Sequence, residues 1–143
     1  MILSIDPGNI ESAYVVLDDN LKPLEFGKIK NEDLLYDLNL FNARYENGIE
    51  HFAIEMIASY GMGVGKEVFD TCVWIGRFIQ KANYHTIKQV YRGEVKMNMC
   101  HIMKAKDSNI ILALADRFAY GIGNFGKGTK KNKGWFHGFS KDV

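Results

Sequence analysis

The sequence predicts an α/β fold with a mixed five-stranded sheet flanked by helices. Three short strand-like segments with short connections occupy the N-terminal region, and two further apolar segments then alternate with helix-like segments. Three antiparallel strands followed by strand–helix–strand units give a mixed sheet with helices on its faces. The chain has 143 residues and no linker-like stretch, so we expect one domain over residues 1–143.

The first three strands are expected at residues 1–5, 13–17 and 24–30. Residues 1–5 are almost wholly apolar and end at Asp6-Pro7-Gly8, a strong turn signal. Residues 13–17 are rich in β-branched and aromatic side chains, as strands are. Two later strands are expected at residues 51–55 and 86–91.

Four helices are predicted between and after these strands. Asn31 is expected to cap the first, which Asn47-Gly48 would end. Further helices are expected at residues 66–82, 93–102 and 108–118, whereas residues 120–141 are rich in Gly and Lys without a clear period. The first helix would bury Leu34, Leu35, Leu38 and Phe41, and the second would bury Phe69, Cys72, Val73, Gly76 and Ile79.

Composition and the N-terminus indicate a cytoplasmic protein, or one of the host cytoplasm if the source is a virus. No apolar run approaches the roughly 20 residues that span a bilayer, so no membrane partner is expected. The first residues lack the basic start and the cleavage site of a signal peptide. Cys72 and Cys100 lack metal-ligand spacing, so buried thiols are expected rather than a zinc site or a disulfide.

Charge is distributed unevenly along the chain. Residues 1–83 contain 7 Lys and Arg against 13 Asp and Glu, whereas residues 84–143 contain 11 against 4. A basic half of this kind is a weak indication of a polyanionic partner such as nucleic acid.

Two carboxylates follow apolar strands directly and form the candidate site. Asp6 ends the first strand and Glu55 ends the fourth. If these strands are neighbours, the two carboxylates meet at one edge of the sheet and repel unless a cation lies between them. Mg²⁺ prefers such oxygen ligands. The alternatives are an Asx-turn at Asp6 and a solvated glutamate at position 55.

Several segments resemble RuvC-like resolvases, which are nucleases of the ribonuclease H-like superfamily. Ser4-Ile5-Asp6-Pro7-Gly8, followed by Ser12-Ala13, resembles their first motif, and Phe52-Ala53-Ile54-Glu55 resembles the second. Residues 91–96 resemble the segment that carries their catalytic lysine. Residues 104–118 and 128–142 are similar to RuvC-like proteins of bacteriophages, and the resemblance covers essentially the whole chain.

The resemblance implies a structure-selective DNA endonuclease that resolves Holliday junctions and other branched DNA by hydrolysing phosphodiester bonds. It implies two Mg²⁺ ions per active site, with Mn²⁺ as a substitute, and a homodimer. Asp6 would lie between the ions, with Glu55 on one and Asp142 on the other. Lys96 would act on the phosphate or orient the water, unless it is an ordinary DNA-contacting or solvated lysine.

Asp142 has no local feature that marks it as a ligand. By spacing alone it is a solvated tail residue, and Asp107 and Asp116 compete for the role. In RuvC-like proteins the last acidic motif opens a helix, whereas this chain ends at Val143. We therefore expect that C-terminal helix to be missing or truncated here.

DNA contacts are expected from the basic second half. A basic loop followed by Trp135 and Phe136 suits phosphate contacts and stacking on an unpaired base. The alternative is a solvated loop. The candidate DNA-binding residues are Arg92, Lys104, Lys106, Lys127, Lys130, Lys131 and Lys133.

Two other classes of protein compete with a nuclease. One is a non-catalytic DNA-junction-binding protein with an incomplete metal site. The other is an actin-like or sugar-kinase-like ATP-binding protein, which also begins with strand-Asp-x-Gly but needs a second phosphate loop and a second domain. Gly128 stands where a Walker A loop needs Ser or Thr, so no nucleotide cofactor is expected.

Overall fold

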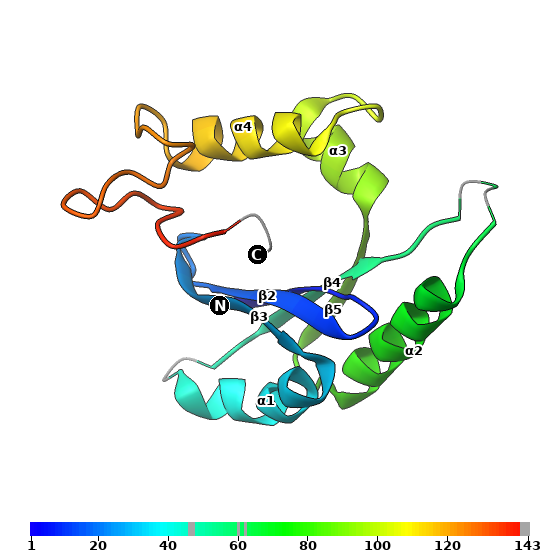
Figure 1. The fold of residues 1–143 in the computed structure, drawn as a ribbon. Helices are drawn as coiled ribbons and strands as arrows, with labels where there is room; N and C mark the ends of the chain where they lie inside the picture. Colours follow the sequence, from blue (N-terminus) through cyan, green and yellow to red (C-terminus); the bar gives the residue numbers. More distant parts are fainter. Residues whose placement is uncertain (46–47, 60, 62, 141–143) are drawn as a thin grey trace. The chain divides into compact units, whose positions relative to one another are not determined.

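The computed structural model describes residues 1–45, 48–59, 61 and 63–140, and its elements are drawn in Figure 1. By internal contacts the chain forms two compact units, the first running from Met1 to Tyr91 and the second beginning at Arg92. The expected single domain therefore stays a prediction.

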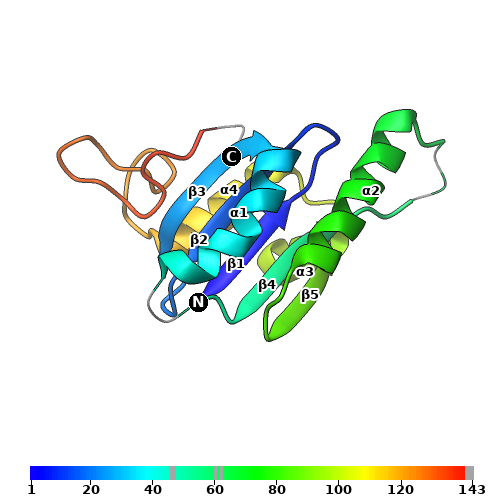
Figure 2. The same cartoon turned by 90° about the horizontal axis from the view of Figure 1, so that it is seen from below.

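The first unit contains the mixed five-stranded sheet that the sequence predicts. Its strand order is β3-β2-β1-β4-β5 (Figure 2). The strands β1, β2 and β3 form an antiparallel meander, while β4 runs parallel to β1 and β5 runs parallel to β4. The bounds are β1 Ile2–Asp6, β2 Glu11–Leu17, β3 Pro23–Lys30, β4 His51–Met56 and β5 Thr86–Tyr91.

One face of this sheet carries the core of the first unit. The helices α1 (Asn31–Arg44) and α2 (Lys66–Lys81) cover that face (Figures 1 and 2). Alternate strand residues point into the core, so Leu3 and Ile5 of β1 are buried there with Phe52 and Ile54 of β4. Each such side chain stabilises the unit by about 1.5–3 kcal/mol through its burial. The strand residues between these buried positions therefore lie on the opposite face of the sheet.

The start of α1 differs from the sequence prediction. The helix begins at Asn31, the N-cap position is Lys30, and no side-chain cap hydrogen bond is made there. Asn31 is fully buried and bonds the loop after β1 instead. The predicted burial of Leu34, Leu38 and Phe41 is confirmed, and Leu35 packs partly buried against the core. The helix ends at Arg44, and Asn47 lies outside the described residues.

The predicted span of α2 is confirmed. Its predicted buried face is wrong except at Ile79, which packs partly buried against the core. The buried residues are Thr71, Trp74, Ile75 and Phe78, while Phe69, Cys72, Val73 and Gly76 are exposed. Both sets follow the same i, i+3, i+4, i+7 spacing, so periodicity could not separate them. The set with the larger side chains buries more apolar area and therefore faces the core.

A polar cluster joins the end of α1 to the sheet. The Glu25 carboxylate accepts hydrogen bonds from the Tyr14 hydroxyl (2.9 Å) and the Tyr45 hydroxyl (2.8 Å), and it pairs with Arg44 (3.0 Å). Burial, together with the bond to Glu25, raises the pKa of Tyr14 to about 12. Tyr14 therefore stays a neutral hydrogen-bond donor at physiological pH.

The second unit holds α3 (Arg92–Cys100) and α4 (Asp107–Phe118), close to the predicted helices. An ion pair of 2.5 Å between Arg92 and Asp107 links the starts of these helices. The segment after α4 is a series of hydrogen-bonded turns with one isolated β-bridge, between Gly128 and Lys133.

Both cysteines are free thiols. Cys72 is exposed on α2 and Cys100 is half-buried at the end of α3, so the prediction of two buried thiols is wrong. Cys72 belongs to the exposed face of α2. Within the described part of the chain, no helix is both long enough and apolar enough to cross a membrane.

Candidate functional site

The strands β1 and β4 are neighbours in the sheet (Figure 2). Asp6 and Glu55 lie at the same end of these two parallel strands. The parallel register pairs Ile5 with Ile54, so the next position along each strand places Asp6 level with Glu55. Ile5 and Ile54 face the core, so both acids emerge on the opposite face. Adjacent strands are about 4.8 Å apart, which brings the two carboxylates within reach of a shared cation.

A lysine that sequence reasoning missed lies in the same cross-strand row. The antiparallel register places Asp6 beside Ala13 and Ala13 beside Lys28, all on one face. Lys28 is exposed and stands two strands, or about 10 Å, from Asp6. The alternation of side chains along β3 is the sequence signal that could have identified Lys28. Lys28 therefore adds a positive charge to the face of the sheet that carries the two acids.

The turn after Asp6 is held by a buried polar network. The backbone N–H of Gly8 donates to the Ser12 hydroxyl (3.2 Å), which donates to the Asn31 side-chain oxygen (2.6 Å). The Asn31 side-chain nitrogen donates to the Gly8 carbonyl (2.9 Å), and its backbone N–H donates to the Ile10 carbonyl (3.0 Å). Ser12 and Asn31 are both fully buried. This network fixes the turn that follows Asp6 against the starts of β2 and α1.

Gly8 is required by a close backbone approach rather than by a left-handed conformation. A Cβ at this position would lie 2.3 Å from the Glu11 carbonyl oxygen, far inside van der Waals contact. Any larger residue would therefore push the turn away from β2. The turn signal of Pro7-Gly8 is visible in the sequence, whereas the crowding at Gly8 is visible only in the structure.

The donor set at the sheet edge fits a divalent cation. Asp6 is exposed and Glu55 is half-buried, and the preceding residues Ile5 and Ile54 anchor the two strands in the core. Hard oxygen ligands of this kind suit Mg²⁺, which keeps several waters when protein supplies only one or two carboxylates. Asp142 lies outside the described residues, and within the described residues no group of three or more acidic, His or Cys ligands occurs.

The remaining predicted residues belong to the second unit. Lys96 is half-buried on α3, and its catalytic role stays a prediction. Lys104, Lys106, Lys130, Lys131 and Lys133 are exposed, whereas Lys127 is half-buried and Arg92 is paired with Asp107. The exposed lysines therefore leave their charge available to a phosphate.

Residues 127–134 form a tight hairpin rather than an unstructured basic loop. The Gly134 N–H donates to the Lys127 carbonyl (3.0 Å), and the Thr129 N–H donates to the Asn132 carbonyl (2.9 Å). Gly128 has a φ of 68°, and a Cβ there would lie 2.3 Å from the Asn132 carbonyl oxygen. Lys130 and Lys131 therefore stand at the tip of a defined turn.

The two aromatics expected to stack on DNA are packed within the second unit. Trp135 lies 6.2 Å from Phe118 between ring centroids, and Phe136 makes an edge-to-face pair with Phe139 at 5.8 Å. Both Trp135 and Phe136 are half-buried. Their expected stacking on a base must therefore compete with contacts inside the unit.

Strand order, mixed direction and flanking helices together define an α/β fold of the ribonuclease H-like class. A RuvC structure from Thermus thermophilus matches with a TM-score of 0.57 and 15% identity, covering 80% of this chain and 77% of that one. A second structure, of T. thermophilus RuvC in complex with a Holliday junction substrate, matches with a TM-score of 0.57 and 16% identity, covering 80% and 76%. The fold is therefore RuvC-like.

No protein-family model matches the chain, and no curated protein matches it. The likeness to RuvC rests on structure at low sequence identity, so it establishes the fold. The roles of the individual residues, the metal ions and the bacteriophage affinity stay predictions.

Proposed function

We propose that this protein is a Mg²⁺-dependent, structure-selective DNA endonuclease that resolves Holliday junctions and other branched DNA by hydrolysing phosphodiester bonds. The observation that carries the proposal is the placement of Asp6 and Glu55 at one end of neighbouring strands, on one face of the sheet. The RuvC-like fold supports it, since one matching structure is a RuvC bound to a Holliday junction substrate.

Asp6 and Glu55 are the residues that would hold the metal ions, with Asp142 as the proposed third ligand. Bound Mg²⁺, or Mn²⁺ in its place, would supply an activated water and stabilise charge on the scissile phosphate. The protein's own task is to hold the two carboxylates level with each other on one face of the sheet. The buried strands and the Asn31 network do this, while Lys96 would add positive charge near the phosphate.

The direct test is cleavage of a labelled four-way junction by the purified full chain at low salt. We expect paired cuts near the branch in Mg²⁺ or Mn²⁺ and none in EDTA, with a linear duplex of the same sequence left intact. Junction binding without cleavage in any divalent cation would replace the proposal with that of a non-catalytic junction-binding protein.

The second unit is proposed to supply most of the DNA-binding charge. No acidic residue occurs between Asp116 and Asp142, whereas that stretch contains Arg117, Lys127, Lys130, Lys131, Lys133 and Lys141. The hairpin places Lys130 and Lys131 at an exposed tip. Exposed lysines bind phosphates mainly by releasing counterions, so they contribute affinity and salt dependence more than sequence specificity.

Replacing Lys130 and Lys131 together by Ala is expected to weaken junction binding and to flatten its salt dependence. The slope of log K against log [salt] is negative, and each lost phosphate contact reduces its magnitude by about 0.9. Losing both lysines should therefore reduce the magnitude by about 1.8. Fluorescence anisotropy with a labelled junction in EDTA measures the slope. A matched double variant, Lys22→Ala with Lys81→Ala, removes the same charge from the first unit and should change it little. Equal slopes for both variants would contradict the role of the hairpin.

A homodimer is part of the proposal, with α2 as the contact surface. Phe69, Cys72, Val73 and Gly76 form an exposed stripe on this helix, and Phe69 and Val73 are 60% and 61% exposed. Nothing lies within 4 Å of a Cβ built at Gly76, so a second helix has room to approach closely there. A second copy of the chain would present the same stripe, and a twofold pair of sites suits the two symmetric strands of a junction.

Val73→Glu is expected to convert the dimer to a monomer. A carboxylate at the centre of an apolar twofold contact loses hydration and faces its own copy, which should weaken dimerisation by about 100-fold or more. Size-exclusion chromatography with light scattering measures the mass. Tyr36→Glu, on the exposed face of α1, is the control. The α2 contact would be wrong if the wild-type chain is monomeric at high micromolar concentration, or if Val73→Glu stays dimeric.

A further inference from the structure

The segment after α4 contains an exposed aromatic ring on a strained turn. Asn124, Phe125 and Gly126 have φ values of 56°, 51° and 79°, so three consecutive residues are left-handed. Residues other than glycine adopt this conformation at a cost in energy, and runs of it are rare. Phe125 lies in the middle of the turn, and its side chain is 57% exposed.

The surrounding structure holds this turn in place. The Lys127 N–H donates to the Asn124 carbonyl (3.0 Å), and the Gly128 N–H donates to the Gly123 carbonyl (3.0 Å). Gly126 is buried, and a Cβ there would lie 2.6 Å from the Ala119 Cβ and 2.8 Å from Phe136. The packed turn therefore holds the Phe125 side chain in its solvent-exposed position.

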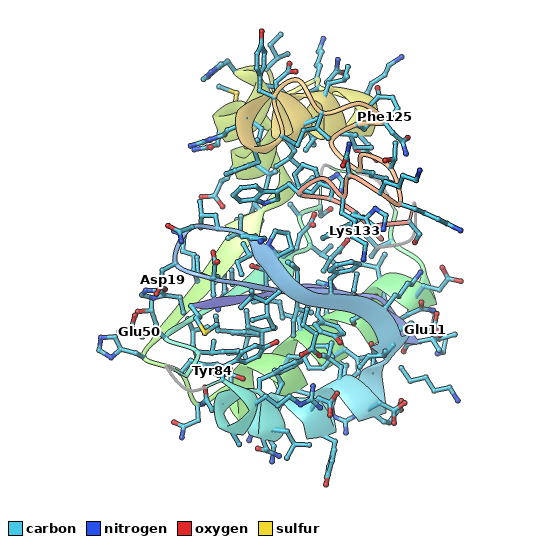
Figure 3. The ribbon with its side chains drawn as sticks, turned by 90° about the vertical axis from the view of Figure 1, so that its left-hand side faces the viewer. Glu11, Asp19, Glu50, Tyr84, Phe125 and Lys133 are labelled. Carbon is cyan, nitrogen blue, oxygen red and sulfur yellow. The ribbon has the colours of Figure 1, made fainter. Side chains whose placement is uncertain are left out.

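The same segment places positive charge beside the ring. Phe125 is followed at once by the hairpin of residues 127–134, whose Lys130, Lys131 and Lys133 are exposed. Figure 3 labels Phe125 and Lys133 on this part of the second unit. The nearest acidic residues in sequence are Asp116 and Asp142. An apolar partner would give the lysines nothing of opposite charge to bind. A nucleic acid offers a base that can stack on Phe125 and phosphates that can bind the lysines.

We infer that Phe125 is a binding residue for an unpaired or unstacked nucleobase at the DNA branch point, with the lysines of the hairpin on the adjoining phosphates. The inference rests on the proposed function, because it names the part of a branched DNA that the second unit would read. Base–aromatic stacking needs only the face of the ring and tolerates any base sequence. A base at a branch point is easier to unstack than one inside a duplex, so the ring would favour branched over linear DNA.

The test compares Phe125→Ala, Phe125→Leu and Phe125→Trp in the full chain, in EDTA so that no strand is cut. Affinities are measured for a four-way junction with two unpaired bases at the branch and for a linear duplex of the same length. We expect Phe125→Ala to weaken junction binding by about 5- to 150-fold, the range for loss of one base stack, and to change duplex binding less than twofold. Phe125→Leu should resemble the Ala variant, and Phe125→Trp should resemble the wild type.

Salt dependence and a matched control separate stacking from a structural role. Phe125→Ala should leave the salt slope unchanged, because it removes no phosphate contact, whereas damage to the hairpin would lower it. Tyr36→Ala removes an exposed aromatic ring beside the acidic side chains of α1 and should leave junction binding unchanged.

Three outcomes would overturn the inference. One is unchanged junction affinity of Phe125→Ala, and another is full affinity of Phe125→Leu. The third is an equal loss for junction and duplex together with a lower salt slope, which would indicate a structural residue. In all three the wild-type chain still binds junctions, so the proposed function survives, whereas wild-type protein that binds no branched DNA would overturn both.

Discussion

Asp6→Asn is expected to reduce junction cleavage on the order of 10³-fold while leaving junction binding within about twofold. The substitution keeps the size of the side chain but removes the negative charge that would hold the metal ions. Metal ions contribute several kcal/mol to phosphodiester hydrolysis, and each 1.36 kcal/mol corresponds to a factor of ten in rate. Single-turnover cleavage of a labelled junction in Mg²⁺ gives the rate, and a gel-shift titration in EDTA gives the affinity.

Glu55→Gln should behave in the same way, because Glu55 is level with Asp6 on the neighbouring strand. Glu50→Gln is the matched control: Glu50 precedes the same strand at its opposite end and is exposed (Figure 3). It should cleave at the wild-type rate. If Asp6→Asn cuts as fast as the control, the carboxylate pair is not the catalytic site, and the nuclease proposal loses the observation on which it depends.

Asn31→Ala is expected to destabilise the protein by about 2–4 kcal/mol and to impair cleavage as well. The substitution leaves the buried Ser12 hydroxyl and the Gly8 carbonyl without their partner, and each stranded buried polar group costs about 1–3 kcal/mol. The turn after Asp6 would then be less firmly held. Displacement of a reacting group by about 1 Å can cost on the order of 10²-fold in rate. Urea unfolding measures stability, and the Mg²⁺ concentration for half-maximal cleavage should rise.

Asn42→Ala is a control that separates the loss of stability from the loss of cleavage expected for Asn31→Ala. Asn42 also lies on α1, but its side chain accepts a single bond, from the Ile49 N–H (3.0 Å), away from the turn at Asp6. It should lower stability by about 1 kcal/mol and leave the Mg²⁺ requirement unchanged. A wild-type Mg²⁺ requirement in Asn31→Ala, measured where the protein is still folded, would show that the network supports the fold without positioning Asp6.

These variants address different parts of one proposed site. Asp6 and Glu55 would bind the metal, Asn31 and Ser12 hold the turn, and the lysines with Phe125 would bind DNA. The proposals for α2 and for the second unit can each fail while the carboxylate pair stands, because they rest on separate groups of residues.

The order and type of the elements could be predicted from local sequence. The apolar strands β1 and β4, and the helices with regular apolar spacing, appear close to their expected positions. These features depend on backbone propensity and on the alternation of side chains along a strand, which neighbouring residues largely determine. The candidate acids were found for the same reason, since each directly follows an apolar run.

Local sequence could not decide which of two equally spaced faces of α2 enters the core. Phe69, Val73 and Gly76 fit the period as well as Trp74 and Phe78 do, and only packing against the sheet selects the larger set. It also could not assign Asn31, whose local signal is a helix cap. Its side chain instead forms hydrogen bonds with Gly8 and Ser12, which are 23 and 19 residues away in sequence.

The sequence by itself therefore determined the strands, the helices and the two acids at the ends of apolar runs in β1 and β4. Only the tertiary structure decided that Asp6 and Glu55 share one face at the same level, because strand pairing and its register depend on contacts between distant segments. A shift of one residue would have sent one carboxylate into the core side of the sheet. The register is fixed because Leu3, Ile5, Phe52 and Ile54 must all be buried on the other face.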